Sequence, residues 1–393
     1  MTGPAPATPL GMRLPLLAGG GVAALAGLYT GLLLLGAPLP SLRPALAEVH
    51  GPGTVLGFVG TLVALERAVA ARARWALLAP AFAAMGALVL VFTGPGLAGK
   101  MLLATAAVLL LAVYRALWRR RPGPALLAQA AGAFAWYAAV LLWLAGFPVA
   151  ETVPWLTGFV VATIAGERLE LARVAVAAAA ERWFLAAVGV LFAGAAAATL
   201  WPGAGYHLFG AGLLAVVAWL VVSDVARRTV RAVGLPRYIA VGLLAGYLWL
   251  AVAGLLWAGA GLTMAGPRYD ATLHAVFLGF TMSMIFVHAP VILPAVLRRP
   301  LPYHRVLYGP LALLHASLLA RLVLGDGLAV AMVWRWSGVA NVAAVLGFAG
   351  CAAVLALRAG RPGPQPARDG AVPPARAADD ATGRTATAAA VRP

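Results

Sequence analysis

Apolar stretches separated by short polar segments follow one another along almost the whole chain. A helix of about 20 apolar residues crosses the roughly 30 Å hydrocarbon core of a bilayer. The pattern therefore predicts an all-α fold, a polytopic membrane bundle of about 12 transmembrane helices occupying residues 1–358. We predict spans near residues 14–36, 49–70, 75–94, 97–118, 124–147, 153–173, 182–200, 204–223, 236–258, 270–295, 304–323 and 334–357.

The composition supports the same class of protein. Hydrophobic residues make up 63% of the chain and charged residues 10%, with a mean hydropathy of +0.92. A soluble domain of this composition would expose much of its apolar surface to water, so the expected partner is a lipid bilayer. The single cysteine, Cys351, excludes disulfides, zinc ribbons and iron–sulfur clusters.

The net charge of +17 reports orientation in the membrane. With a cytoplasmic N-terminus, the inner loops hold seventeen arginines and the outer segments five basic residues, Arg43, Lys100, Arg268, Arg321 and Arg335. This positive-inside bias predicts an inner-membrane protein with both termini in the cytoplasm, and no nucleic-acid partner. Residues 359–393 are rich in Pro, Ala, Gly and Arg, which predicts a disordered cytoplasmic tail.

A sequence motif recurs on every fourth span. GFVGTLVALERAVAAR, residues 57–72, aligns without a gap with GFVVATIAGERLELAR, residues 158–173. A weaker match in span ten begins at Gly279 and has His288 where the other two have Glu66 and Glu167. The motif suggests three repeated four-helix units, about residues 14–118, 124–223 and 236–357. Chance similarity among helices rich in Gly, Ala and Val is the alternative.

Ionisable groups inside a bilayer are costly, so the histidines are the best pointers to a function. His50 lies at the outer end of span two, and His274 lies at the outer end of span ten, after Asp270 as an expected N-cap. Gly53, with two further glycines one and two turns on, leaves room for a planar group or a helix. Two neutral imidazoles at matching depth can ligate haem iron from both faces. The alternative is that each histidine only caps a helix interface.

Two further histidines are candidate metal ligands, with copper as the metal to consider. His207 is at the outer end of span eight, and His288 lies on the face of His274, about 21 Å deeper at 1.5 Å per residue. His288 precedes Pro290, so it also fits a hydrogen bond to a carbonyl that the proline frees. His315 falls within span eleven, where it requires a partner or a cavity.

Two Glu–Arg pairs lie near the inner ends of their helices. The side chains of Glu66–Arg67 and Glu167–Arg168 are expected either to extend to the membrane–water interface or to form ion pairs between repeat units. A glutamate at this depth could also relay protons.

Twelve spans in a three-by-four arrangement, with outer histidines on spans two and ten, resemble the heme–copper oxidase subunit I superfamily. That superfamily includes the NnrS family, which is linked to haem, copper and nitric-oxide stress. The resemblance implies that His50, in EVHGPGTVLGF, and His274, in YDATLHAVFLGF, ligate one haem. It covers all twelve spans, through short motifs.

The departures limit what this resemblance implies. Residues 153–200 contain no histidine, although spans six and seven of the oxidases hold copper-ligating histidines. Span ten lacks the second nearby histidine of the oxidases, and span two lacks the HAHE-like start of NnrS proteins. We therefore expect a haem-binding protein, not a terminal oxidase, in electron transfer, haem handling or nitrosative-stress response, with a redox partner or another membrane subunit. A small-solute transporter and an assembly scaffold are the alternatives.

Overall fold

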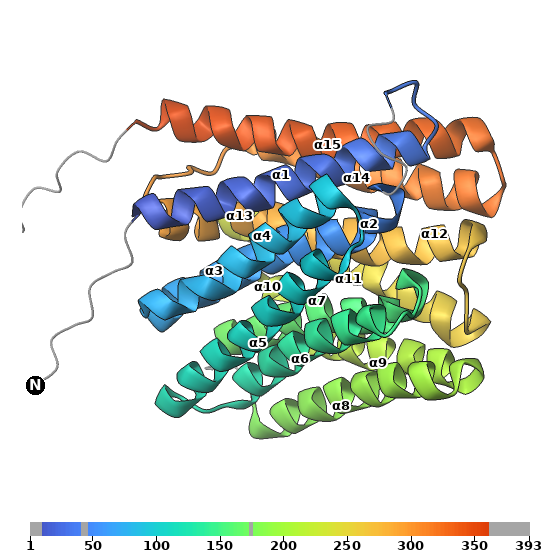
Figure 1. The fold of residues 1–393 in the computed structure, drawn as a ribbon. Coiled ribbons are helices and arrows are strands. Elements are labelled where there is room, and N and C mark those ends of the chain that lie inside the picture. The colour runs from blue at the N-terminus through green and yellow to red at the C-terminus, as the bar shows by residue number, and fades with distance from the viewer. Residues whose placement is uncertain (1–9, 41–45, 173–175, 361–393) are drawn as a thin grey trace, which may run out of the picture. The chain divides into compact units, whose positions relative to one another are not determined.

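A computed structural model describes residues 10–40, 46–172 and 176–360, which form one helical bundle (Figure 1). Twelve helices in these described residues are long and apolar enough to cross a membrane. The prediction of an all-α polytopic bundle is therefore confirmed. Arg43, Arg173 and most of the predicted tail, residues 361–393, lie outside the described residues.

Most of the described spans are single α-helices. These are α1 (Leu10–Leu34), α5 (Leu97–Arg120), α6 (Pro124–Leu144), α7 (Val149–Ala172), α8 (Ala178–Leu200), α9 (Pro202–Ser223), α11 (Leu235–Ala260) and α15 (Ala331–Arg358). The third span joins the 3₁₀ turn η2 (Arg74–Leu77) to α4 (Leu78–Thr93), and a short helix, α10 (Ala226–Thr229), lies between α9 and α11. Each of the twelve begins and ends within four residues of its predicted bounds. The larger differences arise because polar residues such as Glu151 and Asp326 extend a helix beyond its apolar stretch.

Three spans change helix type along their length, which the apolar pattern did not predict. Span two joins α2 (Leu46–Pro52), the π-helix η1 (Gly53–Val59) and α3 (Gly60–Ala71). Span ten joins α12 (Gly266–His274), the π-helix η3 (Ala275–Met282) and α13 (Ser283–Leu297). Span eleven joins the 3₁₀ turn η4 (Arg305–Leu307), α14 (Tyr308–Ala320) and the π-helix η5 (Arg321–Gly327). Such π-segments are rare and often lie at functional sites.

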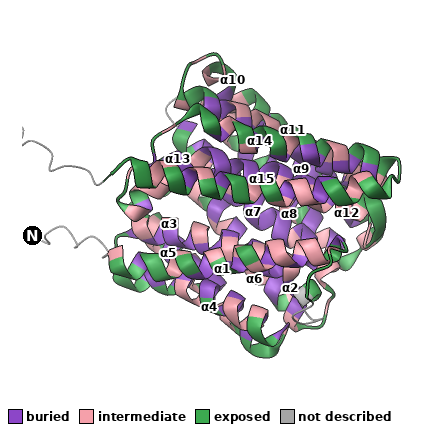
Figure 2. Ribbon diagram, turned by 90° about the horizontal axis from the view of Figure 1, so that it is seen from above, coloured by how far each residue is buried: buried purple, intermediate pink, exposed green. Residues whose placement is uncertain are grey.

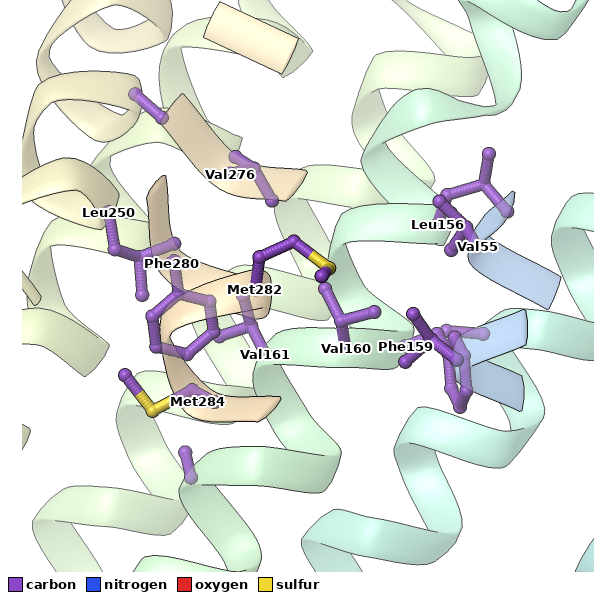
Figure 3. Packing of buried hydrophobic residues seen from close by; sticks show 14 of the residues in the cluster. Val55, Leu156, Phe159, Val160, Val161, Leu250, Val276, Phe280, Met282 and Met284 are labelled. Atoms are coloured by element: carbon purple, nitrogen blue, oxygen red, sulfur yellow. The ribbon is translucent and has the colours of Figure 1, made fainter. Parts of the chain in front are cut away.

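The spans that carry the repeated motif are the most buried. In spans two, six and ten, 61%, 72% and 61% of the residues in an 18-residue apolar stretch are buried, against 22–56% in the other spans described. Figure 2 shows the buried positions turned toward the middle of the bundle. Figure 3 shows Val55 of η1, Phe159 and Val160 of α7 and Met282 of η3 in one buried hydrophobic cluster. The chain thus brings together the three helices that bear its ionisable motif residues; the triplication itself stays a prediction.

The outer surface of the bundle carries large apolar side chains. Phe92, Trp183, Leu248 and Leu357 are each more than half exposed. Their exposure to water would be unfavourable, whereas contact with lipid chains is not. The bundle is therefore suited to a bilayer.

Glycines allow α8 and α9 to pack with their backbones in contact. A Cβ atom at Gly194 of α8 would lie 2.5 Å from the backbone nitrogen and Cα of Phe209 in α9. A Cβ atom at Gly189, on an exposed position of the same helix, would meet nothing within 4 Å. The two positions form a matched pair for testing this packing.

We expect Gly194→Ala to destabilise the purified protein by about 1–3 kcal/mol, because the backbone of α9 must move away from the added methyl group. Gly189→Ala should leave stability unchanged or raise it by up to about 1 kcal/mol, through helix propensity alone. Thermal unfolding in detergent measures both. Equal unfolding temperatures for the two variants would contradict the observed helix packing.

Candidate functional site

His50 lies at the end of α2, directly before Gly51, Pro52 and the π-helix η1. Its Nδ1 is 2.9 Å from the carbonyl oxygen of Gly27 in α1. Since a carbonyl only accepts hydrogen bonds, Nδ1 is the protonated nitrogen, and Nε2 carries the lone pair. Helix α1 lies close to this imidazole: a Cβ atom built at Gly31 would be in van der Waals contact with the His50 ring, at 3.5 Å.

His274 lies at the end of α12, directly before the π-helix η3. Its Nδ1 is 2.8 Å from the carbonyl oxygen of Asp270 and 3.2 Å from the Asp270 carboxylate. Nδ1 is again the donor, so Nε2 has the lone pair. The prediction that Asp270 caps this helix is wrong, because α12 begins at Gly266 with Ala265 as its N-cap. Main-chain and carboxylate acceptors, not a helix N-terminus, select the tautomer.

The Asp270 carboxylate fixes this part of span ten to two neighbouring helices. Arg321 of η5 donates to both carboxylate oxygens, at 3.0 Å each, and Trp334 of α15 donates to one of them at 3.1 Å. Bidentate guanidinium–carboxylate pairs are strong and directional. The Asp270 carboxylate that lies beside His274 Nδ1 is therefore fixed in place by Arg321 and Trp334. Sequence reasoning missed this support because spans eleven and twelve carry no motif that links them to Asp270.

The structure brings His50 and His274 together at one end of the bundle, the histidine end, where α2 and α12 lie in Figure 1. His50 is within electrostatic range of His274, Asp270 and Arg321. His274 directly precedes a π-helix and His50 lies three residues before one, and neither Nε2 makes a hydrogen bond with any described residue. Two imidazoles with free lone pairs therefore face the same end of the bundle.

Open space lies one turn beyond His50. Gly53 is buried, yet a Cβ atom built there would meet nothing within 4 Å. The space beside Gly57 is occupied by the side chain of Ala87, and a Cβ atom at Gly60 would lie 2.7 Å from the ring of Trp136. The predicted roles of the three glycines thus separate. Gly57 and Gly60 let neighbouring side chains approach closely, while the position of a Cβ atom at Gly53 has open space around it.

The available donor set suits haem better than copper. Among the residues that the structure describes, no three His, Cys, Asp or Glu side chains come together to hold a metal ion. A protein copper site draws most of its ligands from side chains, whereas haem iron takes four nitrogens from the porphyrin and needs at most two from the protein. His50 and His274 fit the second requirement.

His207 lies apart from this pair, on an exposed part of α9. Its Nδ1 donates to the carbonyl oxygen of Ala258 at 2.7 Å, near the C-terminal end of α11. A Cβ atom at Gly261, which follows α11 with φ of +65°, would lie 2.6 Å from its Nε2. His207 therefore satisfies a carbonyl at a helix end. Its metal-binding role stays a prediction.

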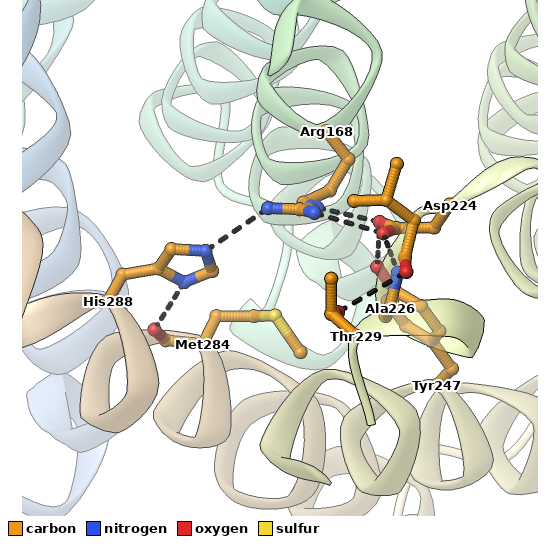
Figure 4. A network of polar contacts seen from close by, with 8 residues as sticks. Arg168, Asp224, Ala226, Thr229, Tyr247, Met284 and His288 are labelled. Carbon is orange, nitrogen blue, oxygen red and sulfur yellow. Dashed lines mark hydrogen bonds and ion pairs between the residues drawn. The ribbon is translucent and has the colours of Figure 1, made fainter. Parts of the chain in front are cut away.

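His288 belongs to a buried polar network toward the other end of the bundle, shown in Figure 4. Its Nδ1 donates to the Met284 carbonyl oxygen at 2.8 Å, and its Nε2 accepts from Arg168 Nη1 at 3.4 Å. The carbonyl that Pro290 frees is that of Phe286, and it accepts from Tyr238 instead, at 3.4 Å. Both ring nitrogens of His288 are thus engaged, and its predicted role as a metal ligand stays untested.

The centre of this network is a buried ion pair. Arg168 donates from Nε and Nη2 to the two oxygens of Asp224, at 2.6 and 2.9 Å. Tyr247 and the backbone N–H of Ala226 also donate to Asp224, at 2.7 and 2.8 Å. Burial alone would raise the pKa of Asp224, but the hydrogen bonds and charge of Arg168, with the other two donors, hold that pKa below its ordinary value. The sequence did not predict this partner because Asp224 lies in a loop after span eight.

The prediction of ion pairs between repeat units is confirmed for one of the two Glu–Arg pairs. Arg67 of span two lies 3.6 Å from Glu167 of span six. Arg168 instead pairs with Asp224. Both arginines are buried, so neither extends to the interface. His315, which required a partner, accepts from Trp249 at 2.9 Å and lies 3.4 Å from Ser283 through its other nitrogen.

Removing the carboxylate charge of Asp224 should destabilise the bundle. We expect Asp224→Asn to cost about 3–5 kcal/mol, because it leaves Arg168 buried without its counter-ion. Tyr247→Phe should cost about 1–3 kcal/mol, as it removes one donor to the carboxylate.

The contribution of this ion pair should depend on pH. Since the pKa of Asp224 is lowered by folding, the pair contributes fully to stability at neutral pH and loses its contribution as the pH falls through that lowered pKa. Thermal unfolding across pH should therefore separate wild type and Asp224→Asn at neutral pH and bring them together in acid; a constant difference would contradict the ion pair.

Comparison with known proteins gives a family and no activity. No curated protein and no solved structure matches the chain. One family model matches residues 13–357, which cover the twelve spans described except for the first three residues of the first span and the last residue of the twelfth. The chain therefore belongs to the family described as a domain of unknown function, DUF8744.

Proposed function

We propose that this chain is a haem-binding membrane protein in which His50 and His274 would hold the iron through their Nε2 atoms. The observation that carries the proposal is that the two imidazoles make the same kind of hydrogen bond and have the same nitrogen free. Each donates its Nδ1 hydrogen to a main-chain carbonyl, of Gly27 or of Asp270, and each leaves Nε2 free at the same end of the bundle. Ligating histidines ordinarily make this second hydrogen bond, which fixes the ring and raises its basicity.

The residues around the pair would hold and shield the group. Gly53 leaves the gap that a porphyrin edge requires, and Arg321 and Trp334 keep Asp270, and through it His274, in place. Haem held by two histidines supplies one-electron transfer. Because two histidines would hold the iron, electron transfer or haem handling is the favoured role over a response to nitrosative stress.

We also propose that the end opposite the histidines faces the cytoplasm of a bacterial-type inner membrane. This end, the arginine-rich end, carries Arg72, Arg119, Arg120 and Arg298 at helix ends. Seventeen basic residues fall on this side of the chain's alternating loops and five on the other. Both termini would then be cytoplasmic, and the haem would lie near the outer surface, accessible to a redox partner or another membrane subunit.

A visible spectrum tests the haem proposal. Protein produced with a supply of haem should show a Soret band, with reduced-minus-oxidised bands typical of two-histidine ligation. His50→Ala and His274→Ala should each lose the band or convert it to a five-coordinate form, because one axial ligand is missing. His207→Ala is the matched control, since His207 binds a carbonyl elsewhere.

A folded but colourless preparation, or spectra unchanged in both histidine variants, would overturn the proposal. Thermal unfolding distinguishes loss of haem from loss of fold. A haem-free protein would favour the alternatives, a small-solute transporter or an assembly scaffold.

A further inference from the structure

A second group of ionisable residues lies between α3, α5, α6 and α7, near the arginine-rich end. Arg67 donates to Glu66 at 2.6 Å, to Gln129 at 3.1 Å and to Glu170 at 3.3 Å. Gln129 in turn donates to Glu170 at 3.1 Å. Together with Glu167, 3.6 Å from Arg67, these residues form what we call the carboxylate cluster.

The carboxylate cluster has an excess of negative charge. Arg168, the nearest further cation, is already neutralised by its bidentate contact with Asp224. Within the described ranges, Arg67, only 8% exposed, is thus the one direct counter-ion for Glu66, Glu167 and Glu170. The side chains of Glu66 and Glu167 are 27% and 23% exposed, so water reaches them only in part. Like charges in a partly desolvated site repel one another, and a further cation relieves that repulsion.

An unpartnered hydroxyl faces the same charges. The side chain of Tyr114 is 1% exposed, and its hydroxyl has no hydrogen-bond partner. It interacts electrostatically with Arg67, Glu167, Glu66 and Glu170. An unsatisfied buried hydroxyl costs about 1–3 kcal/mol, so it indicates a site that is completed by a further species.

A proton is the cation that the geometry favours. The Oε1 atoms of Glu66 and Glu167 lie against the same nitrogen of Arg67, at 2.6 and 3.6 Å. Nowhere in the described residues do three such side chains come close enough to hold a metal ion. Two carboxyl groups near one guanidinium can share a proton. Glu170 contacts the same guanidinium, and its side chain, 55% exposed, is the most solvent-accessible of the three.

We propose that Glu66 and Glu167 share one exchangeable proton, which enters and leaves through Glu170 from the arginine-rich end. The proton comes from a hydronium ion, forms an O–H bond on one carboxyl group, and returns to water when that bond breaks. The charged and titratable groups that face Glu167 and Glu66 are Arg67, Arg168, Glu170, Tyr114 and His288. His288, at the position that the sequence motif aligns with the two glutamates, is within electrostatic range of Glu66.

Infrared difference spectroscopy of the full chain in lipid vesicles tests this proposal. At neutral pH the wild type should show the carbonyl stretch of a protonated carboxyl group, which shifts in D₂O and disappears on alkalinisation. Glu167→Gln and Glu66→Gln should each abolish this band, because two carboxylates beside Arg67 no longer need the proton. Tyr114→Phe should shift the band without removing it, since it removes a nearby hydroxyl dipole but neither carboxyl group.

Glu48→Gln is the matched control, because Glu48 is exposed at the histidine end. Thermal unfolding identifies any variant that fails to fold, and the two glutamine variants serve as independent tests of one another. Absence of the band from the wild type at neutral pH, or its persistence in both variants, would overturn the proposal. So would removal of the band by sodium chloride at constant pH, which would indicate a sodium site. The measurement does not depend on haem, so it stands apart from the test of His50 and His274.

Discussion

A polar group within a membrane-spanning bundle is costly unless it finds a partner inside the protein, and this constraint shapes the arrangement of the described helices. Arg168 is the clearest case, since it reaches from span six to Asp224 and His288, and Tyr247 donates to the same Asp224 carboxylate. Water and lipid cannot replace such partners in hydrocarbon. The helices that carry ionisable residues are therefore drawn to the middle, and the apolar helices surround them.

The same constraint produces two different kinds of polar site. At the histidine end, Asp270 is fully engaged with Arg321, Trp334 and His274, so the imidazole is fixed and its outer nitrogen is left free. In the carboxylate cluster, charges are unequal and a hydroxyl is unpaired. A site with complete support suits a bound group of defined geometry, whereas a site with unequal charge suits an exchangeable ion.

The π-helices link this polar organisation to the backbone. One begins directly after His274, one begins three residues after His50, and a third begins at Arg321, the counter-ion of Asp270. An inserted residue rotates the following side chains relative to the preceding ones, so His50 and the glycines after it take positions that a regular helix would not give. No sequence pattern predicts such an insertion, because the packing of neighbouring helices decides whether the inserted residue is favourable.

The sequence by itself determined the fold class, the twelve spans and the even-numbered helices that bear ionisable residues, because hydrocarbon thickness and hydropathy act on each segment separately. It also indicated that His50 and His274 belong to one end, since alternate spans run in the same direction. Only the tertiary structure decided that Asp224 pairs with Arg168, that Arg321 holds Asp270, and that three carboxyl groups surround Arg67. Those contacts join residues far apart in the chain, and their formation depends on helix rotation and close approach, which no local pattern encodes.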